Sequence, residues 1–470
     1  MKKQKIAAKM NAVLGHIRKN NFVYIIVFLF FIIKILIVSN YTIVWWDSAV
    51  YIGMGKYIYS LGNAGLWESS RPIVWPLMLG FFWKSGFDII LFGRIMEIIF
   101  GSLCILLTYM IGKKIFDEKI GLLASIFLVL SPTFFFFNGV MLTEIASTFF
   151  SLVAIYSFLN KKHFISGIFF GTAFMTRFLQ LFVLISILLA MIVYNKNKIK
   201  NLNKMIFGFI LAILPYLIIN QALYNDFLFP FKQQLYLSQN SGWLNYLPVT
   251  YYFVGLFKEN FLYLLSIMGI FLVFKGKDAN KTTIAFSFAA FFILFNLINQ
   301  KEMRFLIVLF PYMYLLVAYS FFNILKYIKS KSAEQVLFFA IILSLVFSQA
   351  TTYAYFKNEF SKDNQYIFFQ QKLNEVKGKI WVSNPITPVF SDLTISNLMY
   401  YPFFNEMKKE ELISIKKPDF IFLDSCDLAC KPVDTDCKNS KKSLMDHLKI
   451  QLKIIYSSTK NQCTQLIFAK

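Results

Sequence analysis

Long apolar segments alternate with short clusters of basic residues along most of the chain. Because a helix needs about 20 apolar residues to cross the hydrocarbon core of a bilayer, this pattern predicts an all-α polytopic membrane bundle of about eleven helices. One run is long enough for a hairpin of two shorter helices. The predicted spans lie at about residues 22–39, 89–111, 120–137, 141–159, 164–194 (the hairpin), 205–222, 259–274, 283–298, 305–324 and 335–355.

The basic clusters predict the side of the membrane on which each loop lies. Lys and Arg collect in cytoplasmic loops, and here every cluster falls on one side if the N-terminus is cytoplasmic. The large loop at 40–88 and the C-terminus are then extracytoplasmic, as expected for a multi-pass protein of the cell membrane. A cleaved signal peptide is the competing interpretation of the first segment. Lys34 within that segment and the Trp-Trp-Asp after it argue against cleavage.

Composition agrees with a membrane protein. Of the 470 residues, 57% are hydrophobic and only 16% are charged, whereas a soluble domain needs more charged surface. The net charge is +23, but the basic residues lie in clusters between apolar segments rather than on one polar face. They therefore indicate membrane topology and not a nucleic-acid partner.

The pattern changes at about residue 357, where apolar runs shorten and prolines appear at 384–388. Short β-like runs at 380–383, 419–423, 452–456 and 465–468 alternate with helical stretches at about 405–416 and 440–449. We therefore expect a basic cytoplasmic N-terminus at 1–21, a transmembrane domain at 22–356 and a small extracytoplasmic α/β domain at 357–470.

Four of the five cysteines lie in this C-terminal tail: Cys426, Cys430, Cys437 and Cys463. An extracytoplasmic location favours disulfide bonds. A zinc site is the alternative, but the tight Cys-x-x-Cys pairs usual for zinc are missing. Four cysteines allow three pairings, and the sequence does not choose among them.

Ionisable side chains at the predicted outer face are the candidate site residues. Asp47 follows two tryptophans just beyond the first span, where an apolar surrounding is expected to raise its proton affinity and let it accept a proton from a hydroxyl. Arg71, Arg177, Lys301 and Arg304 fall on the same face, and a guanidinium suits a phosphate. The alternative for Asp47 is a solvated loop aspartate, and the alternative for each of the four cations is an interfacial anchor.

Glu144 begins the fourth span and is either a second acidic site residue or a favourable anion in a first helical turn. Arg94 and Glu97 lie three positions apart on one helix face and are expected to neutralise each other.

Several motifs together resemble the GT-C superfamily of membrane glycosyltransferases, especially its protein O-mannosyltransferase and aminoarabinose-transferase branch. The likeness covers about residues 20–325. The motifs are Trp46-Asp47-Ser48-Ala49-Val50-Tyr51, Ser70-Arg71-Pro72-Ile73-Val74-Trp75-Pro76-Leu77, Leu142-Thr143-Glu144, the Gly-rich hairpin Gly167–Arg177, and Gln300-Lys301-Glu302-Met303-Arg304-Phe305.

The resemblance implies inverting transfer of a sugar from a polyprenyl-phosphate donor to a protein, lipid or glycan outside the cytoplasm. It makes Asp47 the general base. Further substrate-binding residues that it implies are Tyr51, Arg71, Glu144, Arg177, Lys301, Glu302 and Arg304, with the cations among them holding the lipid phosphate.

This sequence departs from the family pattern at two positions. Ser48 replaces the second residue of the acidic pair of protein O-mannosyltransferases, which argues against a protein acceptor, and Ile73 replaces a proline. The first loop has no Asp-x-Asp, which argues against the metal-dependent oligosaccharyltransferase branch, although a divalent metal ion stays open as a cofactor.

The rival hypothesis is a membrane transporter or lipid flippase, since intramembrane charges also line permeation paths. Two matching halves, frequent in transporters, are not found in the sequence.

Overall fold

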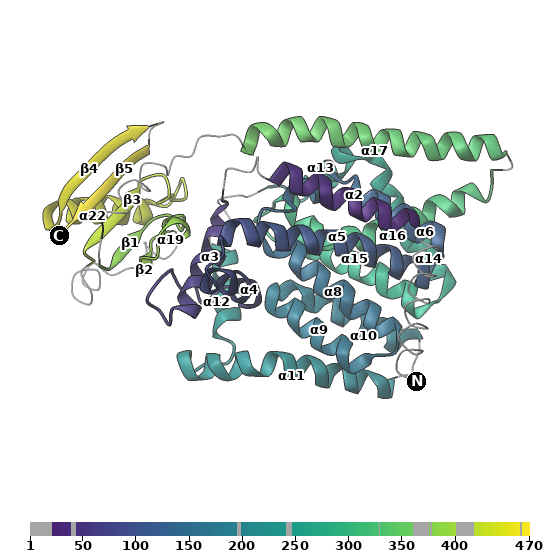
Figure 1. Cartoon of the computed structure of the whole chain (residues 1–470), viewed down its shortest axis with the longest axis horizontal. Coiled ribbons are helices and arrows are strands. Elements are labelled where there is room, and N and C mark those ends of the chain that lie inside the picture. Colours follow the sequence, from purple (N-terminus) through teal and green to yellow (C-terminus); the bar gives the residue numbers. More distant parts are fainter. Residues whose placement is uncertain are drawn as a thin grey trace.

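Helices build the chain up to Phe360, and a small sheet follows (Figure 1). The computed structural model describes residues 21–38, 44–194, 199–240, 247–328, 330–360, 376, 378–400, 418–460 and 463–470. The helices before the sheet are α2 (Asn21–Val38), α3 (Trp46–Tyr59), α4 (Val74–Lys84), α5 (Ile89–Ile115), α6 (Glu118–Val129), α7 (Pro132–Phe137), α8 (Thr143–Leu159), α9 (His163–Thr176), η1 (Phe178–Gln180), α10 (Leu181–Tyr194), α11 (Ile199–Tyr224), α12 (Phe229–Asn240), α13 (Tyr251–Glu259), η4 (Phe261–Leu264), α14 (Leu265–Gly276), α15 (Ala279–Leu297), η5 (Met303–Val308), α16 (Phe310–Leu325) and α17 (Lys331–Phe360).

Several of these helices are those of a multi-pass membrane protein. Within the described ranges, four are long and apolar enough to cross a bilayer: Ile89–Ile115, Leu202–Tyr224, Ala279–Leu297 and Lys331–Thr352. Shorter apolar helices accompany them at Phe22–Val38, Thr143–Leu159, His163–Thr176, Phe178–Tyr194, Phe261–Gly276 and Phe310–Leu325. Every predicted span coincides with a helix or helix pair. The number of about eleven spans and the orientation of the termini stay predictions.

The predicted hairpin is present as α9 and α10, and it breaks at Arg177, which ends α9 in an extended conformation before η1. The predicted span at 120–137 is likewise two helices, because Pro132 begins α7 and Ser131 caps it by accepting the N–H of Phe134.

The loop predicted at 40–88 contains α3 and α4, which pack closely through glycines. A Cβ at Gly55 would lie 2.7 Å from both the Gly80 nitrogen and the Pro76 oxygen. Only glycine therefore permits this approach. Figure 1 shows α3 and α4 between the bundle and the sheet.

The sheet has five strands in the order β2-β1-β3-β5-β4. Strands β1 (Ile380–Val382), β2 (Ile395–Leu398) and β3 (Phe420–Asp424) are parallel, whereas β5 (Cys463–Ala469) runs antiparallel to both β3 and β4 (Lys453–Lys460). Two helices complete the domain, α19 (Thr387–Phe390) and α22 (Thr435–Gln451).

The two faces of the sheet pack on different partners. Alternate strand residues point to opposite faces. Ile421 and Leu423 join a cluster with Leu444 and Leu448 of α22. The intervening Phe422 belongs to a second cluster, which includes residues of the 40–88 loop as well as the sheet: Val50, Met54, Leu66, Val376, Ile380, Val382, Ile395, Phe422 and Ile467. The tail is therefore packed against α3.

Sequence reasoning located four of the five strands and α22, but not β2 or α19. The helix expected at about 405–416 falls outside the described residues. The cysteines of the tail form two disulfides, Cys426–Cys463 and Cys430–Cys437, and Cys104 is a buried free thiol. The domain boundary at 357 stays a prediction.

Candidate active site

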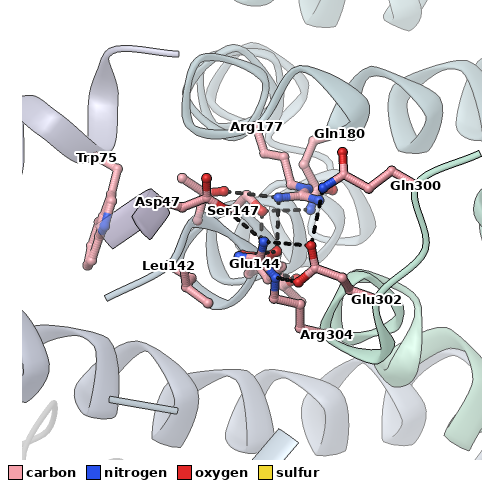
Figure 2. A network of polar contacts seen from close by, with 12 residues as sticks. Asp47, Trp75, Leu142, Glu144, Ser147, Arg177, Gln180, Gln300, Glu302 and Arg304 are labelled. Atoms are coloured by element: carbon pink, nitrogen blue, oxygen red, sulfur yellow. Dashed lines mark hydrogen bonds and ion pairs between the residues drawn. The ribbon is translucent and has the colours of Figure 1, made fainter. Parts of the chain in front are cut away.

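Residues that are far apart in the sequence meet in one polar cluster. Figure 2 shows Asp47, Glu144, Arg177, Glu302 and Arg304 pointing toward one another. They come from the start of α3, the first turn of α8, the end of α9 and the η5 region. Asp47 and Glu144 each lie in the first turn of a helix, where the helix dipole favours an anion.

Asp47 is held between two guanidinium groups. Its Oδ1 lies 2.9 Å from Nη1 of Arg71, and its Oδ2 lies 2.6 Å from Nη2 of Arg304. The Asp47 side chain is 19% exposed, so the pair is screened less than a surface pair would be. The carboxylate is therefore fixed in orientation while remaining accessible.

Arg304 connects three carboxylates. Besides Asp47, it donates from Nε to Oε2 of Glu302 at 2.6 Å, and its Nη1 lies 3.7 Å from Oε1 of Glu144. Aromatic rings of Trp45 and Phe305 lie against its guanidinium. The planar guanidinium of arginine has several donors and can bind all three carboxylates, whereas the ammonium of lysine would not reproduce this geometry.

Arg177 forms the other side of the cluster. Its Nη1 lies 3.1 Å from Glu144 Oε1 and donates to Thr143 Oγ1 at 3.1 Å. Phe305 also contacts this guanidinium, so the ring lies against both Arg177 and Arg304. The break between α9 and η1 is what brings Arg177 to the cluster.

Sequence reasoning missed Glu68, which pairs with Arg71, and Tyr400, which contacts Glu68. Glu68 Oε1 accepts from Arg71 Nε at 3.2 Å and from the Tyr400 hydroxyl at 3.0 Å. Tyr51, a predicted substrate-binding residue, lies against the Arg71 guanidinium, and its ring centroid is 5.7 Å from Arg71 Cζ. The only sequence signal for Glu68 was its position three residues before Arg71, and Tyr400 had none.

Glu97 supports the loop that precedes Glu144. Its carboxylate accepts the backbone N–H groups of Gly139, Met141 and Leu142 at 3.0, 2.5 and 3.0 Å. Met141 has a φ of +66°, a conformation that is costly for a residue with a side chain. The Trp75 indole also donates to the Met141 carbonyl. Glu97 thus supports this loop through its backbone, and its expected neutralisation by Arg94 stays a prediction.

Among the described residues, Lys301 makes no ion pair with this cluster, although it precedes Glu302 in the chain. Its ammonium donates to the Ile298 carbonyl at 2.6 Å, and the residue is 3% exposed. The structure therefore brings together all the predicted site residues except Lys301.

The cluster contains four carboxylates, from Asp47, Glu68, Glu144 and Glu302, and each is engaged by a guanidinium. This arrangement suits ion pairing with arginine rather than a divalent cation. Within the described residues, the one group with metal-ligand spacing is Asp424, Cys426 and Cys463, and its two sulfurs are joined in a disulfide.

The expected rise in the proton affinity of Asp47 is wrong for this structure. Burial on its own raises the pKa of Asp47, but Arg71 and Arg304 outweigh it and hold the pKa well below its usual range. Asp47 is therefore ionised and paired, and it becomes a stronger base only when a guanidinium turns away.

The comparisons confirm the predicted resemblance to GT-C membrane glycosyltransferases, and the fold is similar to theirs. A family model described as dolichyl-phosphate-mannose-protein mannosyltransferase matches residues 70–220. This range includes Arg71, Glu144 and Arg177. No curated protein matches the sequence significantly.

Two solved structures illustrate the likeness. ArnT from Cupriavidus metallidurans, determined bound to undecaprenyl phosphate, is 10% identical with a TM-score of 0.68, and the alignment covers 96% of this chain and 98% of ArnT. An oligosaccharyltransferase from Archaeoglobus fulgidus, tethered to an acceptor peptide, is 12% identical with a TM-score of 0.57 and coverages of 85% and 69%. The likeness to ArnT extends into the C-terminal sheet domain.

Proposed function

We propose that the protein is an inverting glycosyltransferase that moves a sugar from a polyprenyl-phosphate donor to a hydroxyl acceptor on the extracytoplasmic side of the membrane. The observation that carries this proposal is the Asp47 carboxylate lying between Arg71 and Arg304. It combines a base with cations suited to a phosphate. The GT-C fold, the mannosyltransferase family model and the lipid bound by ArnT support the same donor class.

In this mechanism the acceptor oxygen forms a bond to the anomeric carbon from the face opposite the phosphate. The bond from that carbon to the phosphate oxygen breaks, its electron pair stays on the polyprenyl phosphate, and the hydroxyl proton moves to Asp47. The configuration inverts because attack and departure occur on opposite faces. Arg71, Arg177 and Arg304 would stabilise the charge that develops on the leaving phosphate.

Donor binding is expected to release the base. Four carboxylates already engage the three arginines, so a phosphate must take donors from one of them. When Arg71 or Arg304 turns toward the phosphate, Asp47 loses part of the field that lowers its pKa. Its basicity would then rise at the moment when the donor is present.

The test is transfer of radiolabelled sugar from a synthetic polyprenyl-phosphate hexose by the purified protein in nanodiscs, with Asp47→Asn in parallel. We expect a labelled acceptor from the wild type alone. Equal turnover by both would overturn the base assignment. Activity with a nucleotide sugar and none with the lipid-linked donor would overturn the donor class, and movement of lipid across the membrane without chemical change would favour a flippase.

A further inference from the structure

Tyr400, in the C-terminal domain, reaches the proposed donor site through a short chain of polar contacts. Its hydroxyl donates to Glu68 Oε1 at 3.0 Å, and Arg71 Nε donates to the same oxygen at 3.2 Å. Arg71 then pairs with Asp47 at 2.9 Å. The Tyr400 ring also packs edge-on against Trp46, beside Asp47 in the chain.

The C-terminal domain is held in place by backbone hydrogen bonds to the external loop. Gly65 donates to the Leu393 carbonyl at 2.9 Å and accepts from the Ile395 N–H at 2.8 Å. Gly65 therefore pairs with Thr394 as a parallel bridge next to β2, and Thr394 lies six residues before Tyr400. Main-chain pairing of this kind fixes register as well as distance.

A buried lysine makes a second connection between the external loop and the tail. Lys56 of α3 is 4% exposed, and its ammonium donates to the Val389 and Ser391 carbonyls and to Asp392 Oδ1, at 3.3, 3.0 and 2.9 Å. Together with the apolar cluster shared by Val50, Met54 and the sheet, this leaves Tyr400 little freedom to move relative to Glu68.

Glu68 needs a group that sets its orientation. Its Oε1 takes donors from Tyr400, Ser70 and Arg71, whereas Oε2 is buried with no hydrogen-bond partner in the described structure. Without the tyrosine hydroxyl, the carboxylate can turn and bind Arg71 through both oxygens, a stronger arrangement that draws Arg71 away from Asp47 and from a phosphate. Burial and the nearby Glu68 also raise the pKa of Tyr400, so its hydroxyl keeps the proton that it donates.

We infer that Tyr400 is a positioning residue that keeps Glu68 from capturing Arg71, and that the C-terminal domain is thereby part of the lipid-phosphate site. This inference rests on the proposed function, because it assigns Arg71 to the donor phosphate. The C-terminal domain would then contribute directly to donor binding.

The test is the affinity of the full-length protein in nanodiscs for polyprenyl monophosphate, together with the KM for donor and acceptor. We expect Tyr400→Phe to weaken lipid binding and raise the donor KM about tenfold, with the acceptor KM unchanged, since a hydrogen bond to a charged group is stronger than one between neutral groups. Tyr456→Phe is the matched control, because Tyr456 lies on β4, at the opposite edge of the sheet from β2, and it should behave as wild type.

A double-mutant cycle distinguishes positioning from general weakening of the fold. In a Glu68→Gln background, Tyr400→Phe should change lipid affinity by less than about twofold, because the charged acceptor is gone. An equal effect in both backgrounds, or no effect of Tyr400→Phe in the wild type, would overturn the inference. If Tyr400→Phe does not fold, Glu68→Gln alone must still alter lipid affinity without changing the acceptor KM. Failure of the wild type to bind the lipid would instead overturn the proposed function.

Discussion

Asp47 and Arg304 lie 257 positions apart in the chain, yet Oδ2 of one is 2.6 Å from Nη2 of the other. The ion pair joins the 40–88 loop to η5, and Arg304 extends it to Glu302 and Glu144. A carboxylate proposed as a base is thus neutralised by a cation proposed to hold the phosphate. The two roles are therefore coupled, because the carboxylate and the phosphate compete for the same guanidinium.

Asp47→Asn should separate chemistry from binding. Loss of a general base is expected to reduce transfer roughly 100- to 10,000-fold. The same change removes the carboxylate that competes for Arg71 and Arg304, so affinity for polyprenyl monophosphate should rise severalfold. Single-turnover transfer and lipid binding in nanodiscs measure the two effects separately.

Asp88→Asn is the matched control for that variant. Asp88 caps α5 by accepting the N–H groups of Ile90 and Leu91, and asparagine caps about as well as aspartate. It should therefore leave both transfer and lipid affinity unchanged. Weaker lipid binding by Asp47→Asn would argue that Asp47 helps the arginines rather than competing for them.

Arg304→Gln should both inactivate and destabilise the protein. It leaves Asp47, Glu302 and Glu144 near one another without their shared cation, and breaking a buried ion pair costs about 3–5 kcal/mol. Arg304→Lys keeps the charge but not the planar guanidinium with its several donors, so it should recover much of the stability and little of the activity.

Thermal unfolding and transfer assays on the two Arg304 variants check this. Lys232→Gln serves as the control, since it removes an exposed pair with Asp226 that contributes little. Full activity in Arg304→Lys would show that charge alone, and not fork geometry, is required.

The sequence predicted most helices because each predicted span consists largely of apolar residues, and it predicted much of the site because charged residues at the ends of such segments are conspicuous. It could not predict the electrostatic state of Asp47, since burial alone raises a carboxyl pKa and only the fold shows how many cations surround it.

Tyr400 and Glu68 were missed for a different reason. Their contact spans 332 positions, and neither residue lies at the end of an apolar segment. Strand β2 was missed because it is short and only Ile395 in it is buried, so it shows little hydrophobic pattern.

The two disulfides should contribute unequally to the stability of the tail. Cys426 and Cys463 are separated by 37 positions, but Cys430 and Cys437 by only 7. In the chain-entropy model, the longer loop corresponds to about 4 kcal/mol and the shorter to about 2.5 kcal/mol. Replacing each pair by serines and measuring denaturant unfolding of the full-length protein tests this order, and equal losses would contradict it.

Asp427 should make the tail less stable as the pH rises. Burial raises the pKa of Asp427 to about 7, although Ser383 and Asn384 donate to its carboxylate. Because the folded state holds this proton more tightly than the unfolded state, the stabilisation is complete below about pH 4 and is lost as the pH rises through about 7.

Asp427→Asn cannot ionise, so its melting temperature should fall a few degrees less than that of the wild type between about pH 5 and pH 8. Differential scanning fluorimetry of the full-length protein measures this difference, with the exposed Asp446→Asn as control. The same pH dependence in wild type and Asp427→Asn would show that another group is responsible.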